Sequence, residues 1–176
     1  MNGMLDSLID ERENATFDYI ERGSVHILLC GHSTAHVKEI AERTSPIHIE
    51  LLTSKELYDS SNDLLKELKI QSKSITVIPA FTNSALRDGI RAIIARFLTL
   101  KELFPDRRFY FGITGGTNLM VVEAALSALA VGADMHYILK EGHSGYNEGK
   151  VLLFNPHEIR SLMAETSKRS GTDASP

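Results

Sequence analysis

Two short polar segments contain residue types that can bind an anionic ligand. Residues 114–118 have the sequence Thr-Gly-Gly-Thr-Asn, and residues 31–34 have the sequence Gly-His-Ser-Thr. The adjacent glycines in the first segment can adopt positive φ angles and let another molecule approach the backbone closely. A helix that begins there, capped by Thr117 or Asn118, would direct free N–H groups and its positive dipole end toward a phosphate. An ordinary turn between a strand and a helix accounts for the same residues, so both interpretations stay open.

The second segment offers hydroxyl groups and an imidazole. Ser33 and Thr34 are candidate caps of a helix that starts near residue 35, and the same hydroxyls lie where α/β folds bind ligands, at the carboxyl end of a first strand. His32 is a candidate hydrogen-bond donor toward phosphate. His32 and His36 have helical i,i+4 spacing, but no Cys or Asp cluster accompanies them, and we expect no metal ion.

The alternation of apolar strands with amphipathic helices predicts the elements that position these segments. We expect strands at 25–30, 47–52, 75–78, 109–113, 135–139 and 151–154, and helices at 35–43, 54–68, 84–104, 118–131 and 156–165. This order predicts an α/β, Rossmann-like fold, with a mostly parallel six-stranded sheet and helices on both faces. The last strand is expected to be antiparallel, because its connection is too short for a helical crossover.

The carboxyl edge of such a sheet gathers loops that lie far apart in the sequence. Three segments follow strands and are expected to meet in one cleft: 31–34, 82–84 and 114–118. Thr82 and Asn83 are therefore further candidates for ligand contact. Glu50 lies near the interval at which dinucleotide folds carry a ribose-binding acid, but the fingerprint Gly-x-Gly-x-x-Gly is absent. NAD binding has little support, and we expect no cofactor.

The helix expected at 118–131 is apolar nearly all round, with Glu123 and Ser127 as its main polar residues. A surface helix normally shows one apolar stripe, so we expect this helix to be covered on both sides. The sheet can cover one side. A second subunit would cover the other and place the two glycine turns beside a symmetric interface, which predicts a homodimer.

Composition limits the other possibilities. The chain has 176 residues, of which 43% are hydrophobic, enough for one domain with a real core. We expect an N-terminal helical segment at 1–23, one domain at 24–166 and a disordered tail at 167–176. A net charge of −4 argues against a protein that coats long nucleic acid. The only cysteine, Cys30, excludes internal disulfides, and the absence of a membrane-spanning apolar run predicts a cytoplasmic protein without membrane contact.

A resemblance to a known family adds to this interpretation. Residues 114–120 resemble the Gly-Gly-Thr-Lys-x-Met signature that follows the fourth strand in CARF domains, the CRISPR-associated Rossmann fold. The strand and polar turn at 25–34 match the position of the family's other ligand loop, so the resemblance covers residues 24–155. Asn118 stands where the family usually has lysine, and a neutral amide replaces a full positive charge there.

The resemblance implies a function. Similar CARF domains bind cyclic oligoadenylates as homodimers in type III CRISPR antiviral defence, which implies a sensor of cyclic tetra-adenylate (cA4) or cyclic hexa-adenylate (cA6). The implied ligand-binding residues are Gly31, His32, Ser33, Thr34, Thr82, Asn83, Thr114, Gly115, Gly116, Thr117, Asn118 and Met120. Residues after 154 are expected to form only a helix and a tail, so any effector would be a separate protein.

Two other functions stay open at this point. A stand-alone ring nuclease would cleave the cyclic oligoadenylate without a metal ion, with Ser33, His32 and Asn118 as candidate catalytic residues. The absent lysine argues against efficient cleavage. The third possibility is a regulatory or scaffold subunit that binds another nucleotide.

Overall fold

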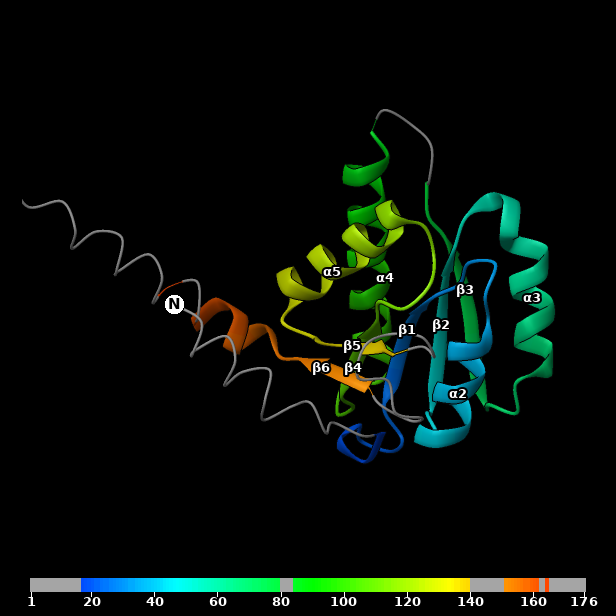
Figure 1. The fold of residues 1–176 in the computed structure, drawn as a ribbon, viewed down its shortest axis with the longest axis horizontal. Helices are drawn as coiled ribbons and strands as arrows, with labels where there is room; N and C mark the ends of the chain where they lie inside the picture. The colour runs from blue at the N-terminus through cyan, green and yellow to red at the C-terminus, as the bar shows by residue number, and fades with distance from the viewer. Residues whose placement is uncertain (1–16, 80–83, 140–150, 162–163, 165–176) are drawn as a thin grey trace, which may run out of the picture.

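The computed structural model describes residues 17–79, 84–139, 151–161 and 164. Helices cover both faces of one sheet (Figure 1), whose six strands have the order β3-β2-β1-β4-β5-β6. The strands are β1 Val25–Leu29, β2 His48–Thr53, β3 Ser72–Val77, β4 Phe109–Gly112, β5 Asp134–Ile138 and β6 Val151–Phe154. Neighbouring strands are parallel except β5 and β6, which are antiparallel. The α/β, Rossmann-like fold and the antiparallel last strand are confirmed.

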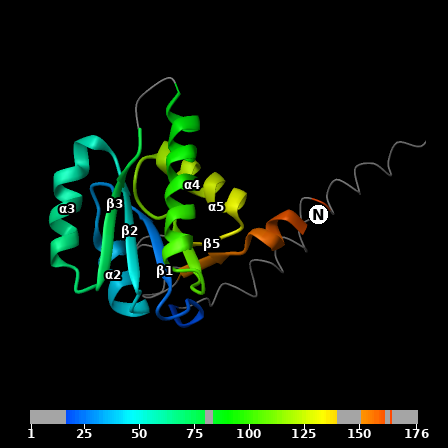
Figure 2. The same cartoon turned by 180° about the vertical axis from the view of Figure 1, so that it is seen from behind.

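The helices divide between the two faces of the sheet (Figures 1 and 2). α2 (Ala35–Thr44) and α3 (Tyr58–Glu67) cover one face, and α4 (Ala85–Leu103) and α5 (Asn118–Val131) cover the other. The 3-10 helices are η1 (Phe17–Tyr19) and η2 (Lys55–Leu57), and residues 156–161 are helical after β6. Side chains alternate along β1, so that Ile27 and Leu29 pack with α4 and α5 while Leu28 and Cys30 pack with α2 and α3. Both faces of β1 are therefore buried, which explains its uninterrupted apolar sequence.

The side of the sheet to which the chain adds new strands changes between β1 and β4, although these two strands are parallel. The chain adds β2 and β3 on one side of β1 and then crosses back through α4 to place β4 on the other side. The loops that leave β1 and β4 therefore turn toward opposite faces of the sheet. Ligands of open α/β sheets bind in the crevice that opens at such a point, at the carboxyl ends of the strands.

Some boundaries differ from those expected from apolar patterning. β3 begins at Ser72, three residues before the predicted start, because the polar residues 72–74 pair with β2 through their backbone. Pairing uses main-chain groups, so an edge strand can extend into polar sequence. The helix expected at 54–68 is divided into η2 and α3.

Glu50 belongs to a buried ion network and not to the ligand edge. It lies in the middle of β2, paired with Ile27 and Ser74, and is 0% exposed. Its carboxylate accepts hydrogen bonds from Ser74 Oγ at 2.5 Å, Thr76 Oγ1 at 2.8 Å and Arg96 Nε at 2.8 Å. Burial alone would raise the pKa of Glu50, but these bonds and one from a neighbouring imidazole lower it below its ordinary value. Both carboxylate oxygens of Glu50 accept hydrogen bonds within the protein and the side chain is buried, so it is not a ribose-binding acid.

Several expectations concern residues outside the described ranges. They include most of the N-terminal segment 1–23, the loop 82–83 and the tail 167–176. Among the helices that the structure describes, none combines the length and the apolar composition needed to cross a membrane.

Candidate functional site

The loops that follow β1 and β4 touch each other through their backbones. Their strands are neighbours in the sheet, with Val25 opposite Phe109 and Leu28 opposite Gly112. At the ends of these strands, a Cβ atom placed on Gly31 would lie 2.8 Å from the backbone N of Gly116. Only glycine permits so close an approach. The structure therefore brings the two polar segments of the sequence into one site, the loop pair 31–34 and 114–118.

The glycine turn has the conformation expected from its sequence. Gly115 and Gly116 have φ angles of 87° and 72°. Thr117 is the N-cap of α5, where its hydroxyl accepts a hydrogen bond from the backbone N of Met120 at 3.3 Å. Asn118, the alternative cap, is instead the first residue of the helix. Thr117 thus satisfies one amide of the first turn and leaves earlier amides of the helix without an intrahelical partner.

The ligand residues implied by the resemblance divide into an exposed and a buried group. His32, Ser33, Gly116, Thr117 and Asn118 are exposed, Thr34 and Gly115 are half-buried, and Gly31, Thr114 and Met120 are buried. Two of the buried residues make contacts within the protein. Thr114 Oγ1 accepts a hydrogen bond from the backbone N of Ile138 at 2.7 Å, and Met120 packs in the core beneath the turn. These contacts hold the turn in place, and a ligand contact of either residue stays a prediction.

Thr82 and Asn83 lie outside the described residues, and their place relative to the site stays a prediction. β3, which precedes them, is separated from β1 by β2.

The electrostatics of the loop pair come from dipoles and not from charged side chains. Neither segment contains Lys, Arg, Asp or Glu. α2 and α5 both begin at this edge of the sheet, and Thr34, at the N-cap of α2, makes no side-chain capping bond. Two positive helix ends and their free amides therefore lie at one edge of the sheet, together with the exposed residues Ser33, Thr117 and Asn118. This arrangement suits a polyanion rich in hydrogen-bonding groups.

Two further histidines, which the sequence did not single out, are buried in the sheet, His26 in β1 and His136 in β5. His26 and His136 are almost fully buried, and His26 Nδ1 lies 3.4 Å from His136 Nε2. The pKa of His26 is lowered mainly by burial and secondly by the neighbouring His136. The pKa of His136 is lowered to about 3, mainly by burial and secondly by His36. Both rings are therefore neutral near pH 7. Their only signal in the sequence is that each is a polar residue within an apolar strand.

His32 and His36, which have i,i+4 spacing, differ in their exposure to solvent. His32 is exposed, whereas His36 is buried and its Nε2 is 2.7 Å from the carbonyl oxygen of Leu29. In the part of the chain that the structure describes, no three His, Cys, Asp or Glu side chains come together as a metal site requires.

α5 directs Glu123 and Ser127 inward. Glu123 is 0% exposed, and its carboxyl lies against Gly89 of α4, where any larger residue would overlap it. Among the described residues, neither carboxyl oxygen has a hydrogen-bond partner. Burial therefore raises the pKa of Glu123 from 4.5 to about 7. Because the folded-state pKa is raised, the stability linked to this group is present below pH 4.5 and is lost as the pH rises through about 7.

Glu123→Gln should become more stable relative to the wild type as the pH rises. Between pH 5 and 8 the gain should be about 2–3 kcal/mol, since one pKa unit corresponds to about 1.4 kcal/mol. Urea unfolding followed across this pH range measures it. Glu102→Gln, on the exposed surface of α4, is the control for loss of a carboxyl group. A stability difference that stays constant with pH would show that Glu123 does not titrate in the folded state.

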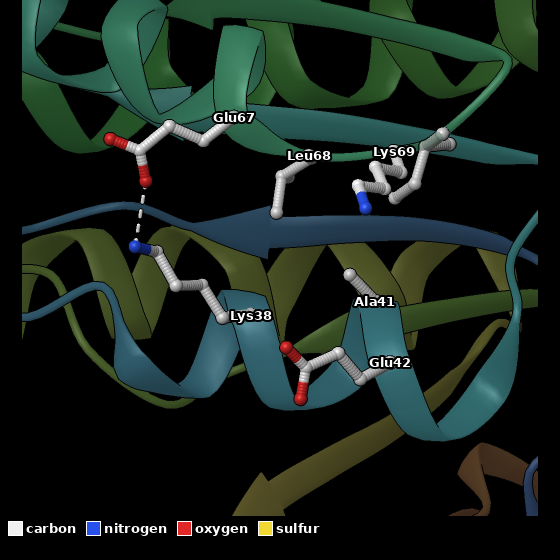
Figure 3. Close-up of a pocket in the computed structure, with 7 residues that line it drawn as sticks. Lys38, Ala41, Glu42, Glu67, Leu68 and Lys69 are labelled. Carbon is white, nitrogen blue, oxygen red and sulfur yellow. Dashed lines mark hydrogen bonds and ion pairs between the residues drawn. The ribbon is translucent and has the colours of Figure 1, made fainter.

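A groove lies elsewhere, between α2 and the end of α3 (Figure 3). It encloses about 460 Å³ and is lined by Lys38, Ala41, Glu42, Glu67, Leu68, Lys69 and Ile70. An ion pair between Lys38 Nζ and Glu67 Oε2, 2.7 Å apart, crosses it. None of these residues belongs to the loop pair, and two lysines balance two glutamates, so the groove lacks the positive potential that an anion requires.

Three solved structures similar to this chain are of proteins bound to, or activated by, a cyclic oligoadenylate or its analogue. Csm6 from Enterococcus italicus, bound to cyclic hexa-2'-fluoro-hexa-dAMP, aligns with 87% of this chain and 47% of its own, with a TM-score of 0.63 and 9% identity. Can2 from Sulfobacillus thermosulfidooxidans, in complex with cyclic tetra-adenylate, aligns with 76% of this chain and 38% of its own, with a TM-score of 0.52 and 14% identity. A type III CRISPR defence DNA nuclease activated by cyclic oligoadenylate aligns with 76% of this chain and 22% of its own, with a TM-score of 0.50 and 15% identity.

The chain spans less than half the length of each of these structures. No protein-family model matches the sequence, and no curated protein sequence matches it significantly. Identities this low establish the fold alone. The chain has the fold of these proteins, and this fold together with the motif at 114–120 is consistent with a CARF domain.

Proposed function

We propose that this protein is a homodimeric sensor that binds one cyclic oligoadenylate ring, cA4 or cA6, between the loop pairs of two copies. The observation that carries the proposal is the backbone contact between Gly31 and Gly116 at the carboxyl ends of β1 and β4. It brings two helix N-termini and the exposed groups of both loops together at one edge of the sheet, and neither loop carries a charged side chain. Proteins of the same fold are bound to cA4 and to a cyclic hexa-adenylate analogue, which supports this ligand class.

The surface of α5 supports the dimer. Val122 and Leu126 are 45% and 43% exposed, one helical turn apart, on a helix whose polar Glu123 and Ser127 are buried. In the part of the chain that the structure describes, the side of α5 with Val122 and Leu126 stays exposed, whereas the sequence predicts cover on both sides. A second copy packed on Val122 and Leu126 would bury this apolar side and bring two α5 N-termini together around one symmetric ring.

Isothermal titration calorimetry with cA4 and cA6 tests the proposal. We expect one of the two rings to bind with a stoichiometry of one ring per two chains. Linear tetra-adenylate is the matched control, because it has the same bases without the symmetry of the ring. No binding of either ring to the folded protein would refute the proposal.

A charge placed on the α5 surface should separate the copies and weaken binding. Leu126→Glu puts a carboxylate beside its symmetry-related copy, so we expect a monomer in analytical ultracentrifugation and at least tenfold weaker ring binding, a loss of about 1.4 kcal/mol. Leu103→Glu is the control. Leu103 is 63% exposed and is the last residue of α4, so it lies outside the proposed α5 interface. A dimer that persists in Leu126→Glu would place the interface elsewhere.

Ring cleavage is assayed in the same samples. Asn118 offers a neutral amide where a lysine would stabilise developing negative charge, so a sensor that leaves the ring intact is the favoured form. Chromatography after long incubation should recover intact ring. Linear products ending in a 2′,3′-cyclic phosphate would identify a ring nuclease instead.

A further inference from the structure

His36 links the two loops of the site from below. It is the second residue of α2 and is 4% exposed. Its Nε2 lies 2.7 Å from the carbonyl oxygen of Leu29, the last residue of β1. A carbonyl oxygen only accepts hydrogen bonds, so Nε2 must carry the proton and donate. The imidazole is thereby fixed to the strand that leads directly into the 31–34 loop.

The same ring supports the glycine turn. A Cβ atom on Gly115 would lie 2.6 Å from His36 Cε1 and 3.0 Å from His36 Nε2. Gly115 is therefore required for two independent reasons: its φ of 87° and the ring packed against its Cα. The height of the turn above the sheet is set by the edge of the imidazole.

These contacts decide how closely the two loops approach. The turn rests on His36 at Gly115, and its next residue, Gly116, meets Gly31. His36 thus contacts the 114–118 loop directly, and its hydrogen bond to Leu29 holds β1, the strand that leads into the 31–34 loop. A smaller side chain at position 36 would let the turn sink and would leave the Leu29 carbonyl without its imidazole donor.

We propose that His36 is a positioning residue that sets the spacing between the 31–34 and 114–118 loops, and through it the affinity for the anionic ligand. This inference rests on the proposed function, since affinity for a cyclic oligoadenylate is its readout. His36 itself is buried and does not touch the ligand. Its role is to fix where Gly116 and the α5 N-terminus meet Gly31.

Substitutions at position 36 separate positioning from simple core filling. His36→Leu keeps an apolar volume and removes the donor, and we expect ring affinity to fall about tenfold, as for loss of one well-placed buried hydrogen bond. His36→Gln places its amide N–H near the position of Nε2, and it should recover most of that loss. Affinity is measured by calorimetry well below the melting temperature of each variant. Equal affinities for wild type, His36→Leu and His36→Gln would overturn the proposal.

A double-mutant cycle tests the contact itself. Gly115→Ala introduces both backbone strain and overlap with the imidazole, and the overlap disappears in a His36→Ala background. We therefore expect Gly115→Ala to reduce ring affinity about tenfold more when His36 is present than when it is absent. Gly116→Ala is the matched control: its φ of 72° is similarly strained, but its Cβ would meet Met120 and Leu29 and not His36. Gly116→Ala should reduce ring affinity by the same factor whether position 36 is His or Ala.

The outcomes distinguish this inference from the proposed function. Wild-type protein that binds neither ring would refute the proposed function, and the ligand role of His36 with it. Wild-type protein that binds, with additive effects of Gly115→Ala and His36→Ala, would refute the role of His36 alone.

Discussion

Gly31→Ala is expected to weaken ring binding by tenfold to a hundredfold. The new Cβ would lie 2.8 Å from the backbone N and 3.0 Å from the Cα of Gly116, and backbone atoms cannot rotate out of its way. The two loops must separate, at the cost of about 1–3 kcal/mol typical of overpacking, and about 1.4 kcal/mol corresponds to tenfold in affinity. Gly31 does not have a positive φ, so the effect isolates the contact between loops from backbone strain.

Gly132→Ala provides the control for this experiment. Gly132 ends α5 with a φ of 71°, and a Cβ there would meet no atom within 4 Å. Its substitution should reduce stability by about 1 kcal/mol through backbone strain while leaving ring affinity unchanged. Calorimetry measures affinity and thermal unfolding measures stability for both variants. Wild-type affinity in Gly31→Ala would show that the loop contact does not shape the binding site.

Arg96→Met is expected to cause the largest loss of stability, about 3–5 kcal/mol of the free energy of unfolding. Glu50 is 0% exposed, and its Oε2 lies 2.8 Å from Arg96 Nη2. Removing the guanidinium leaves a buried carboxylate without its counterion, which costs more than the pair itself contributes. Because the Arg96 side chain is 27% exposed and water can enter its place, we expect the loss to fall at the lower end of this range.

Two comparisons test the cause of that loss. Arg91→Met, at an exposed position on the same helix, should change stability by no more than about 0.5 kcal/mol. The deficit of Arg96→Met should shrink at low pH, because without arginine the pKa of Glu50 rises and the buried carboxyl can become neutral. Urea unfolding at pH 4.5 and pH 7 measures both effects. A deficit that is equal at the two pH values would contradict the explanation.

Much of the fold follows from local patterns in the sequence. The apolar run 25–30 and the aromatic run 109–113 predict β1 and β4 because strands covered on both faces show no polar alternation. The Gly-Gly-Thr order predicts the turn and cap of α5, since positive φ angles and capping bonds depend on a few neighbouring residues. The predicted start of β3 was wrong by three residues, because the polar residues at its beginning are held in the sheet by backbone pairing with β2.

The site was predicted less completely than the fold. The two polar segments were identified because they carry hydroxyls and glycines at strand ends. The inward direction of Thr114 and Met120 was not predicted, because it depends on β5 and on the core beneath the turn. His36 was considered as a metal ligand, whereas the structure places it against Gly115.

The sequence by itself determined the order of strands and helices, the glycine turn at 115–116 and the polar character of both loops. These properties depend on residues near one another in the chain, where side-chain type limits the backbone directly. Only the tertiary structure decided that β1 and β4 are neighbours, that Gly31 meets Gly116 and that Glu50 is neutralised by Arg96. Such contacts join residues 46 or more positions apart, and they depend on how the whole sheet packs, which no local pattern specifies.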